Sequence, residues 1–464
     1  MKQGKPSQIA AKAVAGRGGD PLAVVSRPIV ELTLDPKNPR LHRRPQIRQI
    51  ARSIEAFGFC VPVLLDRQGH VLAGHGRILA CQELGWRDVP TISLAHLTQT
   101  QARAFMIADN RLTDNSTWDE QLLGQQLKEL AEVHLEFRLD ATGFDVGEID
   151  LLIEGVASAP QGASDPVDRI PDLPARPPVS QLGDLWLLDR HRLYCGSALE
   201  EGTYHTLMAH TQAAMVFTDP PYNVPIEGHA SGLGRVVHRE FVMASGELSE
   251  AEFTVFLTQT CRLLAQASVE GALLYVCMDW RHLRELLAAG RAAALALKNL
   301  CVWDKETGGM GSFYRSQHEL VLVWKSGTLP HQNHVQLGQY GRYRTNVWRY
   351  PGIHSFARAK DEGNLLALHP TVKPVALVAD ALLDASTRGD VILDAFVGSG
   401  TTLLAAERTG RICYGLELDP EYVDTAIRRW QRWTGQQARH ALSNRLFDDL
   451  DAEKGGHDVA GGIE

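Results

Sequence analysis

Thr218-Asp219-Pro220-Pro221-Tyr222-Asn223 is the part of the sequence from which the architecture is best inferred. Residues 213–217, directly before it, form an apolar run of the length typical of a buried strand. Two consecutive prolines then end the strand and stiffen the turn that follows. The pattern predicts a carboxylate and an aromatic ring held at the carboxyl end of a strand, which is the edge at which open α/β sheets bind ligands.

Residues 391–402 predict a second strand, a glycine turn and the start of a helix. The turn reads Phe-Val-Gly-Ser-Gly from Phe396 to Gly400. Glu417 ends the next predicted strand, 19 positions after Gly398. A carboxylate about 20 residues after a glycine turn binds ribose hydroxyls in dinucleotide-binding folds, but this turn lacks the third glycine of that motif.

The order of four motifs resembles the beta class of DNA amino-methyltransferases. These motifs are the Asp219-Pro-Pro-Tyr turn, the run His369-Pro-Thr-Val-Lys-Pro, the Phe396 glycine turn and the strand end at Glu417. The resemblance covers residues 181 to about 435, and the methyltransferase domain is expected over residues 181–440. It implies an α/β, Rossmann-like, S-adenosylmethionine-dependent methyltransferase domain with a mostly parallel, doubly wound sheet. The implied catalytic residues are Asp219, Pro220, Pro221 and Tyr222. The implied cofactor-binding residues are Asp394, Phe396, Gly398, Gly400, Thr401, Glu417, His369, Thr371, Lys373 and Pro374.

The resemblance also implies a mechanism on double-stranded DNA. The target base would be flipped out of the duplex, because its amine cannot be reached inside the base stack. Tyr222 would stack on the base, while the Asp219 carboxylate and the Pro220 carbonyl would each accept a hydrogen bond from the amine. Direct methyl transfer needs no covalent intermediate and no metal ion. In this family Asp at position 219 favours the 6-amino group of adenine, whereas Ser goes with the 4-amino group of cytosine; cytosine stays open.

Gly74-His75-Gly76-Arg77 follows one predicted strand and precedes a predicted helix that ends at Gly85. Free amides at a helix N-terminus favour anions, and Arg77 would add a charge-assisted bond to phosphate. The order resembles the ParB-like domain over residues 28–97, which implies a smaller N-terminal α/β domain with a nucleotide or DNA as its ligand. His75 stands where partition proteins usually carry Glu, which argues against nucleotide hydrolysis. A structural turn with a solvated arginine is the alternative.

Composition predicts the remaining segments. Residues 1–27 are expected to be a disordered tail, residues 98–155 a helical extension, residues 156–180 a proline-rich linker and residues 441–464 a polar tail.

A basic segment is expected to form the target-recognition region, residues 328–368. Residues 328–360 contain no Asp or Glu, although the whole chain carries a formal net charge of -8. Basic side chains neutralise phosphates, and aromatic rings stack on bases. The expected DNA contacts are Arg342, Arg344, Arg349, Arg358, Lys360 and, in the N-terminal domain, Arg77.

Composition also limits the compartment and the competing functions. No apolar run approaches the ~18 residues of a membrane span, and the seven cysteines form no CxxC pair. A cytoplasmic protein with reduced thiols, no zinc site and no membrane contact is therefore expected. Two other functions stay open. One is a partition-type DNA-binding protein with a non-catalytic methyltransferase fold, and the other is hydrolysis of nucleotides or phosphodiesters by the N-terminal domain. A homodimer is also left open.

Overall fold

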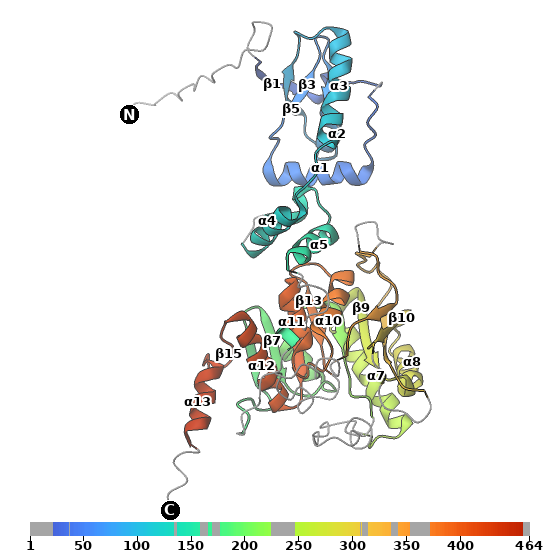
Figure 1. The fold of residues 1–464 in the computed structure, drawn as a ribbon, viewed down its shortest axis with the longest axis vertical. Coiled ribbons are helices and arrows are strands. Elements are labelled where there is room, and N and C mark those ends of the chain that lie inside the picture. Colours follow the sequence, from blue (N-terminus) through green and yellow to red (C-terminus); the bar gives the residue numbers. More distant parts are fainter. Residues whose placement is uncertain are drawn as a thin grey trace, which may run out of the picture. The chain divides into compact units, whose positions relative to one another are not determined.

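The computed structural model describes residues 22–36, 38–133, 137–157, 166–168, 177–223, 246–306, 308, 314–335, 342–352 and 372–457. The chain divides into two compact units, Met1–Ala157 and Ser158–Glu464 (Figure 1). The division falls inside the segment that was expected to be a linker.

The N-terminal unit contains a five-stranded sheet with the order β1-β5-β3-β4-β2. The strands are β1 (Val24–Pro28), β2 (Thr33–Leu34), β3 (Val63–Leu65), β4 (His70–Ala73) and β5 (Asp88–Ser93). Helices α1 (Arg44–Phe57) and α2 (His75–Glu83) contribute Ile47, Ile54 and Ile78 to its core. The strand predicted before Gly74 and the helix predicted after it are confirmed as β4 and α2. Because β1 begins at Val24, the expected tail of residues 1–27 is too long.

The helical extension of this unit consists of α3 (Gln99–Asp114), α4 (Glu120–Glu132) and α5 (Val146–Ala157). A capping box between Thr98 and Gln101 starts α3, because each side chain satisfies a free backbone amide of the other residue. Leu127, Ile149 and Ile153 form a small core between α4 and α5. The helical character expected for residues 98–155 is confirmed.

The C-terminal unit is organised around a ten-stranded sheet with the order β12-β10-β11-β9-β8-β13-β14-β7-β6-β15. The strands are β6 (Leu185–Leu188), β7 (His191–Cys195), β8 (Ala213–Thr218), β9 (Ser268–Met278), β10 (Ala296–Asp304), β11 (His318–Lys325), β12 (Val347–Arg349), β13 (Val391–Asp394), β14 (Ile412–Glu417) and β15 (Arg439–His440). The five central strands, from β9 to β7, are mutually parallel. The pairs β9–β11, β10–β11, β6–β7 and β6–β15 are antiparallel, whereas the edge pair β10–β12 is parallel, so the sheet is mixed outside its parallel centre.

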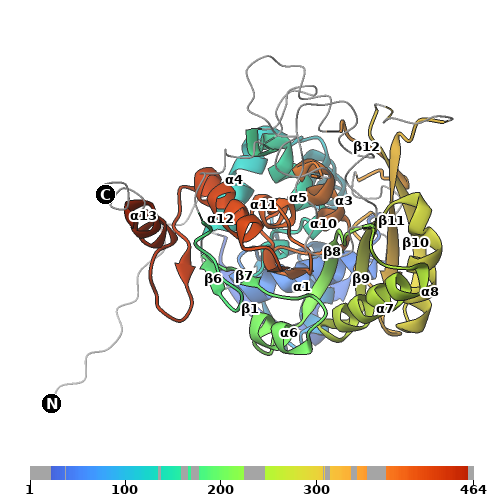
Figure 2. The ribbon, with the colours of Figure 1, turned by 90° about the horizontal axis from the view of Figure 1, so that it is seen from below.

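Helices cover both faces of this sheet (Figure 2). One face carries α6 (Glu201–Met208), α7 (Glu250–Gln266) and α8 (Leu283–Ala292), and the other carries α10 (Val375–Ala385), α11 (Thr401–Thr409) and α12 (Pro420–Thr434). Side chains alternate between the two cores along a strand. In β8, Met215 and Phe217 belong to one core and Val216 to the other. Burial on both faces explains why this strand is a continuous apolar run.

The ends of this unit differ from the expected linker and tail. Val167 and Val179 are buried, and the Asp424 carboxylate accepts bonds from the amides of Val179 and Ser180 at 2.7 and 3.0 Å. Helix α13 (Phe447–His457) follows, and the fully buried Phe447 ring lies 5.3 Å from that of Trp186. These segments are polar on average, but each contains single apolar residues that are buried in the core. The expected linker and the expected tail are therefore wrong for the residues named here.

Two further observations apply to the described residues only. Among them, no helix is long and apolar enough to cross a membrane. The same residues contain no group of three or more His, Cys, Asp or Glu that could hold a metal ion.

Candidate active site

The Asp219 turn and the glycine turn adjoin at the carboxyl edge of the sheet. Strands β8 and β13 are parallel neighbours, with Met215 opposite Ile392. Just beyond these paired residues, the Thr218 hydroxyl donates a 2.8 Å hydrogen bond to the Asp394 carboxylate. The Ala395 amide donates in turn to the Thr218 hydroxyl at 3.2 Å. These bonds fix the two turns against each other.

Asp394 is buried, with 3% of its surface exposed. Besides the Thr218 hydroxyl, its carboxylate accepts a 3.0 Å bond from the Phe396 amide. Burial raises the pKa of Asp394 to about 6, although its hydrogen bonds oppose the rise. This carboxylate therefore holds the start of the glycine turn in place.

The glycine turn approaches its neighbours closely. Gly400 has a φ of 93°, and a Cβ atom there would lie 2.9 Å from the Ala426 Cβ, so a larger residue would be strained and would clash. The Gly398 amide donates a 2.8 Å bond to one carboxylate oxygen of Glu417, and the Asp419 amide donates to the other at 2.8 Å. Burial raises the pKa of Glu417 to about 7. The predicted residues Gly398, Gly400 and Glu417 thus meet in one place.

Beside this turn, Phe396 and Thr401 make contacts in different directions. The Phe396 ring lies 6.0 Å from the Phe256 ring of α7. The Thr401 hydroxyl donates to the Lys373 carbonyl at 3.4 Å. Pro374, directly before α10, is buried. The glycine turn is thereby connected to the segment that carries Lys373.

A buried charge cluster surrounds Asp219. The Lys373 ammonium forms an ion pair with the Asp219 carboxylate, donates to the Tyr222 hydroxyl at 3.1 Å and lies 3.1 Å from a Glu319 oxygen. Only 3% of the Lys373 side chain is exposed. The Tyr222 hydroxyl donates to Asp219 at 2.5 Å. Lys305 pairs with the other Glu319 oxygen at 2.5 Å, so two lysines neutralise two carboxylates.

The pKa values in this cluster diverge. Burial raises the pKa of Asp219, and the Glu319 charge adds to the rise, while Lys373 opposes both. Burial also acts on Glu319, but Lys373 and Lys305 outweigh it and lower its pKa to about 2. The two carboxylates raise the pKa of Lys373 against the effect of burial. Neighbouring titratable groups whose environments push their pKa values apart are typical of functional sites.

Two family models match parts of this chain. The family model described as DNA methylase matches residues 213–428, and the model described as ParB-methyltransferase HTH domain matches residues 121–182. The ParB-like nuclease domain-containing protein YnaK of Escherichia coli is 42% identical over 80 residues, which are 17% of this chain and 92% of YnaK. The type II methyltransferase M2.MboI of Moraxella bovis is 23% identical over 248 residues, which are 50% of this chain and 87% of that protein.

The chain is a ParB-like protein fused to a DNA methylase of the N6/N4 family. Among solved structures, the complex of M1.HpyAVI with SAM matches with a TM-score of 0.37 and 18% identity, covering 51% of this chain and 97% of M1.HpyAVI.

Three residues of the methylase cluster were not anticipated from the sequence. They are Glu319, Lys305 and Trp303, whose ring lies 4.9 Å from the Lys305 ammonium. Glu319 stands at the head of the apolar run 320–324, and a carboxylate buried in such a strand requires a partner. Lys373 was expected to contact the cofactor, but its ammonium lies on Asp219. His369 and Thr371 lie outside the described residues.

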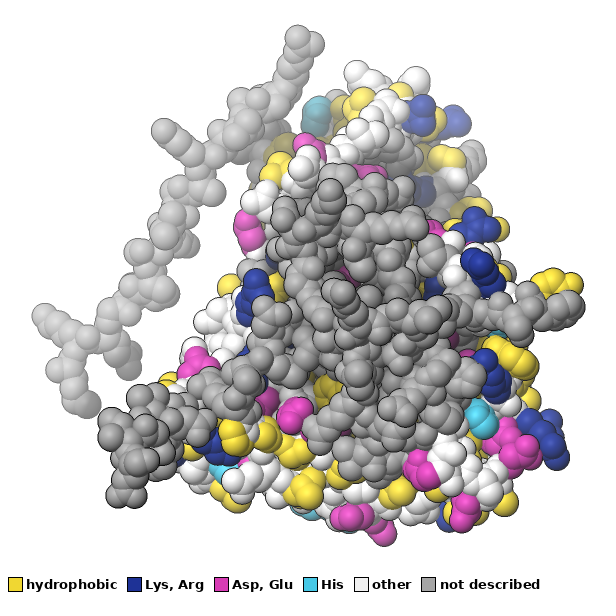
Figure 3. All heavy atoms as spheres, turned by 60° about the horizontal axis from the view of Figure 1, so that its bottom comes forward, with side chains coloured by type: hydrophobic (Ala, Val, Ile, Leu, Met, Phe, Trp, Pro, Cys, Tyr) yellow, Lys and Arg dark blue, Asp and Glu magenta, His cyan; other side chains and the backbone are white. Residues whose placement is uncertain are grey.

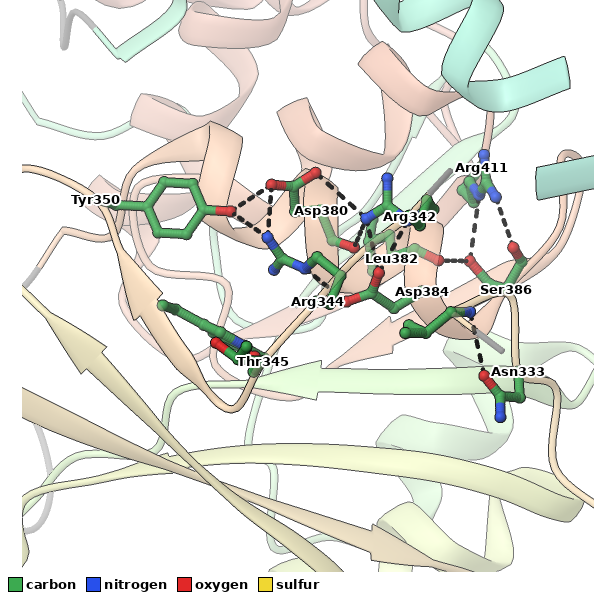
Figure 4. A network of polar contacts seen from close by, with 12 residues as sticks. Asn333, Arg342, Arg344, Thr345, Tyr350, Asp380, Leu382, Asp384, Ser386 and Arg411 are labelled. Atoms are coloured by element: carbon green, nitrogen blue, oxygen red, sulfur yellow. Dashed lines mark hydrogen bonds and ion pairs between the residues drawn. The ribbon is translucent and has the colours of Figure 1, made fainter. Parts of the chain in front are cut away.

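The expected DNA contacts in the methylase fall into three groups. Arg342 donates to the Asp384 carboxylate at 2.7 Å with 4% of its side chain exposed, and Arg344 pairs with Asp380 and Asp384 at 3.1 and 3.2 Å (Figure 4). DNA contact by these two side chains is contradicted, because they fasten the segment before β12 to α10. Arg349 is 77% exposed and lies 3.9 Å from Asp304. Arg358 and Lys360 lie outside the described residues.

Described basic side chains do not gather in one patch on the face shown in Figure 3. There, Lys and Arg are mixed with acidic and hydrophobic side chains around the grey segments.

In the ParB-like domain, Arg77 folds back over the glycine turn. A Cβ atom at Gly74 would lie 3.2 Å from the Arg77 guanidinium. Only 7% of the surface of the neighbouring His75 is exposed, and this burial lowers the pKa of its imidazole. Burial lowers the pKa of Arg77 as well, while the charge of Asp109 opposes the change.

Proposed function

We propose that this DNA methylase transfers a methyl group from S-adenosylmethionine to the 6-amino group of adenine in double-stranded DNA. The observation that carries the proposal is the junction of the Asp219 turn with the glycine turn. The bond from Thr218 to Asp394 and the contacts of Lys373 join an amine-binding carboxylate to a cofactor loop.

The residues of the glycine turn fit S-adenosylmethionine. A side chain at Gly400 would clash with Ala426 of α12, so glycine keeps this turn tight beside the place that we assign to the cofactor. The Glu417 carboxylate accepts the backbone amides of Gly398, Leu418 and Asp419, and its four lone pairs leave one acceptor position for a ribose hydroxyl. Phe396 is only partly buried, so part of its ring is available to pack on the cofactor. When bound, the cofactor supplies an electrophilic methyl group on sulfur.

The Asp219 turn fits a flipped base. Extrusion costs a few kcal/mol, and stacking on the Tyr222 ring recovers part of that cost. Asp219 and the Pro220 carbonyl accept the two N–H bonds of the target amine. This arrangement orients the nitrogen lone pair, which ring conjugation makes a poor nucleophile, and orientation supplies much of the rate.

The test of this proposal is methyl transfer from labelled S-adenosylmethionine to unmethylated duplex DNA, with the modified base identified by mass. We expect N6-methyladenine. N4-methylcytosine would keep the mechanism and overturn the assignment from Asp219. Bound cofactor without any transfer would favour the alternative, a partition-type DNA-binding protein with a non-catalytic methyltransferase fold.

The ParB-like domain supplies a second contact with phosphate. Its glycine turn opens α2, and the Arg77 guanidinium lies over Gly74, so a nucleotide or a DNA phosphate would meet free amides and a positive charge. We expect Arg77→Ala to weaken binding of DNA or nucleotide about tenfold and leave the rate of methyl transfer at saturating DNA unchanged. Binding and single-turnover assays would separate the two effects; unchanged binding of both ligands would contradict this role.

A further inference from the structure

The Lys373 ammonium is paired with the Asp219 carboxylate, which is the group that we expect to accept a hydrogen bond from the target amine. Its ammonium has three N–H donors, and the structure provides three acceptors, which belong to Asp219, Tyr222 and Glu319. Asp219 receives Lys373 on one oxygen and the Tyr222 hydroxyl on the other. An incoming amine that takes the position now held by Lys373 on Asp219 therefore has to displace the ammonium.

Glu319 provides the place to which Lys373 can shift. Its Oε2 atom lies 3.1 Å from the Lys373 ammonium, and its Oε1 atom is fixed by Lys305 at 2.5 Å. Both Glu319 and Lys373 are almost fully buried, with 6% and 3% of their side chains exposed. A buried ammonium without a counter-charge is strongly disfavoured. Without Glu319, releasing Asp219 to the substrate would leave Lys373 unpaired.

We propose that Glu319 is a positioning residue for methyl transfer, which takes the Lys373 ammonium over from Asp219 when the target amine binds. The inference rests on the proposed function, since it concerns the amine that Asp219 would accept. Glu319 touches neither base nor cofactor in this scheme. It acts by keeping Lys373 paired and by adding negative charge beside Asp219.

The charged and titratable groups around Asp219 determine the sign of the pH effect. They are Tyr222 on the same turn, Glu319 of β11, Lys373 before α10, Cys277 of β9, Asp394 of β13 and, through Glu319, Lys305 after β10. Glu319 raises the pKa of Asp219, whereas Lys373 lowers it. Removing the Glu319 charge therefore lowers the pKa of Asp219, so this carboxylate stays ionised at lower pH.

The experiment compares Glu319→Gln with the wild type over a pH series in single-turnover methyl transfer. We expect the rate at saturating DNA to fall about tenfold, because Lys373 then stays on Asp219. The acid limb, which is the fall of the methyl-transfer rate at low pH, is expected to move to lower pH by about one unit. Affinity for S-adenosylmethionine is expected to be unchanged. Glu319→Asp keeps the charge, so its rate is expected to fall at the same acidic pH as that of the wild type. The matched control is Glu270→Gln, because Glu270 is an exposed carboxylate of β9 that accepts a hydrogen bond from Thr328.

A measurement that needs no activity makes the result decisive. The Asp219 carboxyl carbon is followed by NMR titration in the full-length protein, with Asp219→Asn used to assign its signal. A lower Asp219 pKa in Glu319→Gln supports the proposal, even if the wild type transfers no methyl group and the proposed function fails. An unchanged or higher pKa, or an unmoved acid limb in an active protein, overturns it.

Discussion

Asp219→Ala is expected to lower the single-turnover rate of methyl transfer about 1,000-fold while leaving S-adenosylmethionine bound. The variant removes the acceptor that orients the amine, and one misplaced contact of this kind typically costs 10²- to 10³-fold in rate, or ~3–4 kcal/mol. The glycine turn keeps its own bonds, from Gly398 to Glu417 and from Phe396 to Asp394, so the cofactor site stays formed. Calorimetry of cofactor binding and rapid-quench methyl transfer would be measured on the same preparation.

Asp279→Ala is a matched control for this variant. Asp279 follows β9 as Asp219 follows β8, but its carboxylate pairs with the exposed Arg281 at 3.3 Å. We expect its rate to stay within about threefold of the wild type. Retention of a tenth or more of the wild-type rate by Asp219→Ala would show that this carboxylate does not orient the amine.

Arg342→Ala is expected to lower the free energy of unfolding by about 3 kcal/mol. Removing one partner of a buried ion pair leaves the other charge uncompensated, at a typical cost of ~3–5 kcal/mol. Arg344 still reaches Asp384 at 3.2 Å, which places the expected loss at the lower end. Equilibrium urea unfolding, followed by tryptophan fluorescence, measures the change.

The pH dependence of this loss has a definite sign. Burial raises the pKa of Asp384, although Arg342 and Arg344 oppose the rise. Without Arg342 the pKa rises further, so the native chain keeps the proton to a higher pH than the unfolded chain does. The stabilisation given by the protonated carboxyl is lost as the pH rises through this raised value. The deficit of Arg342→Ala is therefore expected to be larger at pH 8 than at pH 5.

Arg349→Ala is the control for the stability measurement. Its side chain is 77% exposed and lies 3.9 Å from Asp304, and such surface pairs contribute less than about 1 kcal/mol. We expect it to unfold like the wild type but to bind DNA more weakly with a shallower salt dependence. Equal stability of Arg342→Ala and Arg349→Ala would show that the buried network is not structural.

Local patterns in the sequence were sufficient to predict the strands and turns of the site. The apolar run before Asp219 and the strand-turn-helix order around Gly398 depend on neighbouring residues only, and both are found as β8 and as β13 followed by α11. The same holds for the glycine turn of the ParB-like domain, which opens α2.

Partners distant in sequence could not be predicted in the same way. Lys373 and Asp219 are 154 positions apart, and Arg342 and Asp384 are 42 apart. The segment around Arg342 contains no acidic residue, so the sequence suggests that its arginines are unpaired. In the folded protein the carboxylates of α10 pair with them. Phe447 likewise becomes part of the core through Trp186, which no short pattern connects to it.

A crystal structure with duplex DNA and a non-reactive cofactor analogue would examine the proposed site as a whole. The proposed mechanism predicts a flipped base on the Tyr222 ring, its amino nitrogen about 3 Å from the Asp219 carboxylate, and the analogue against Gly398 and Gly400. It also predicts that Lys373 has shifted toward Glu319. A target base that stays in the duplex, or one bound away from Asp219 while Lys373 remains paired with that carboxylate, would contradict it.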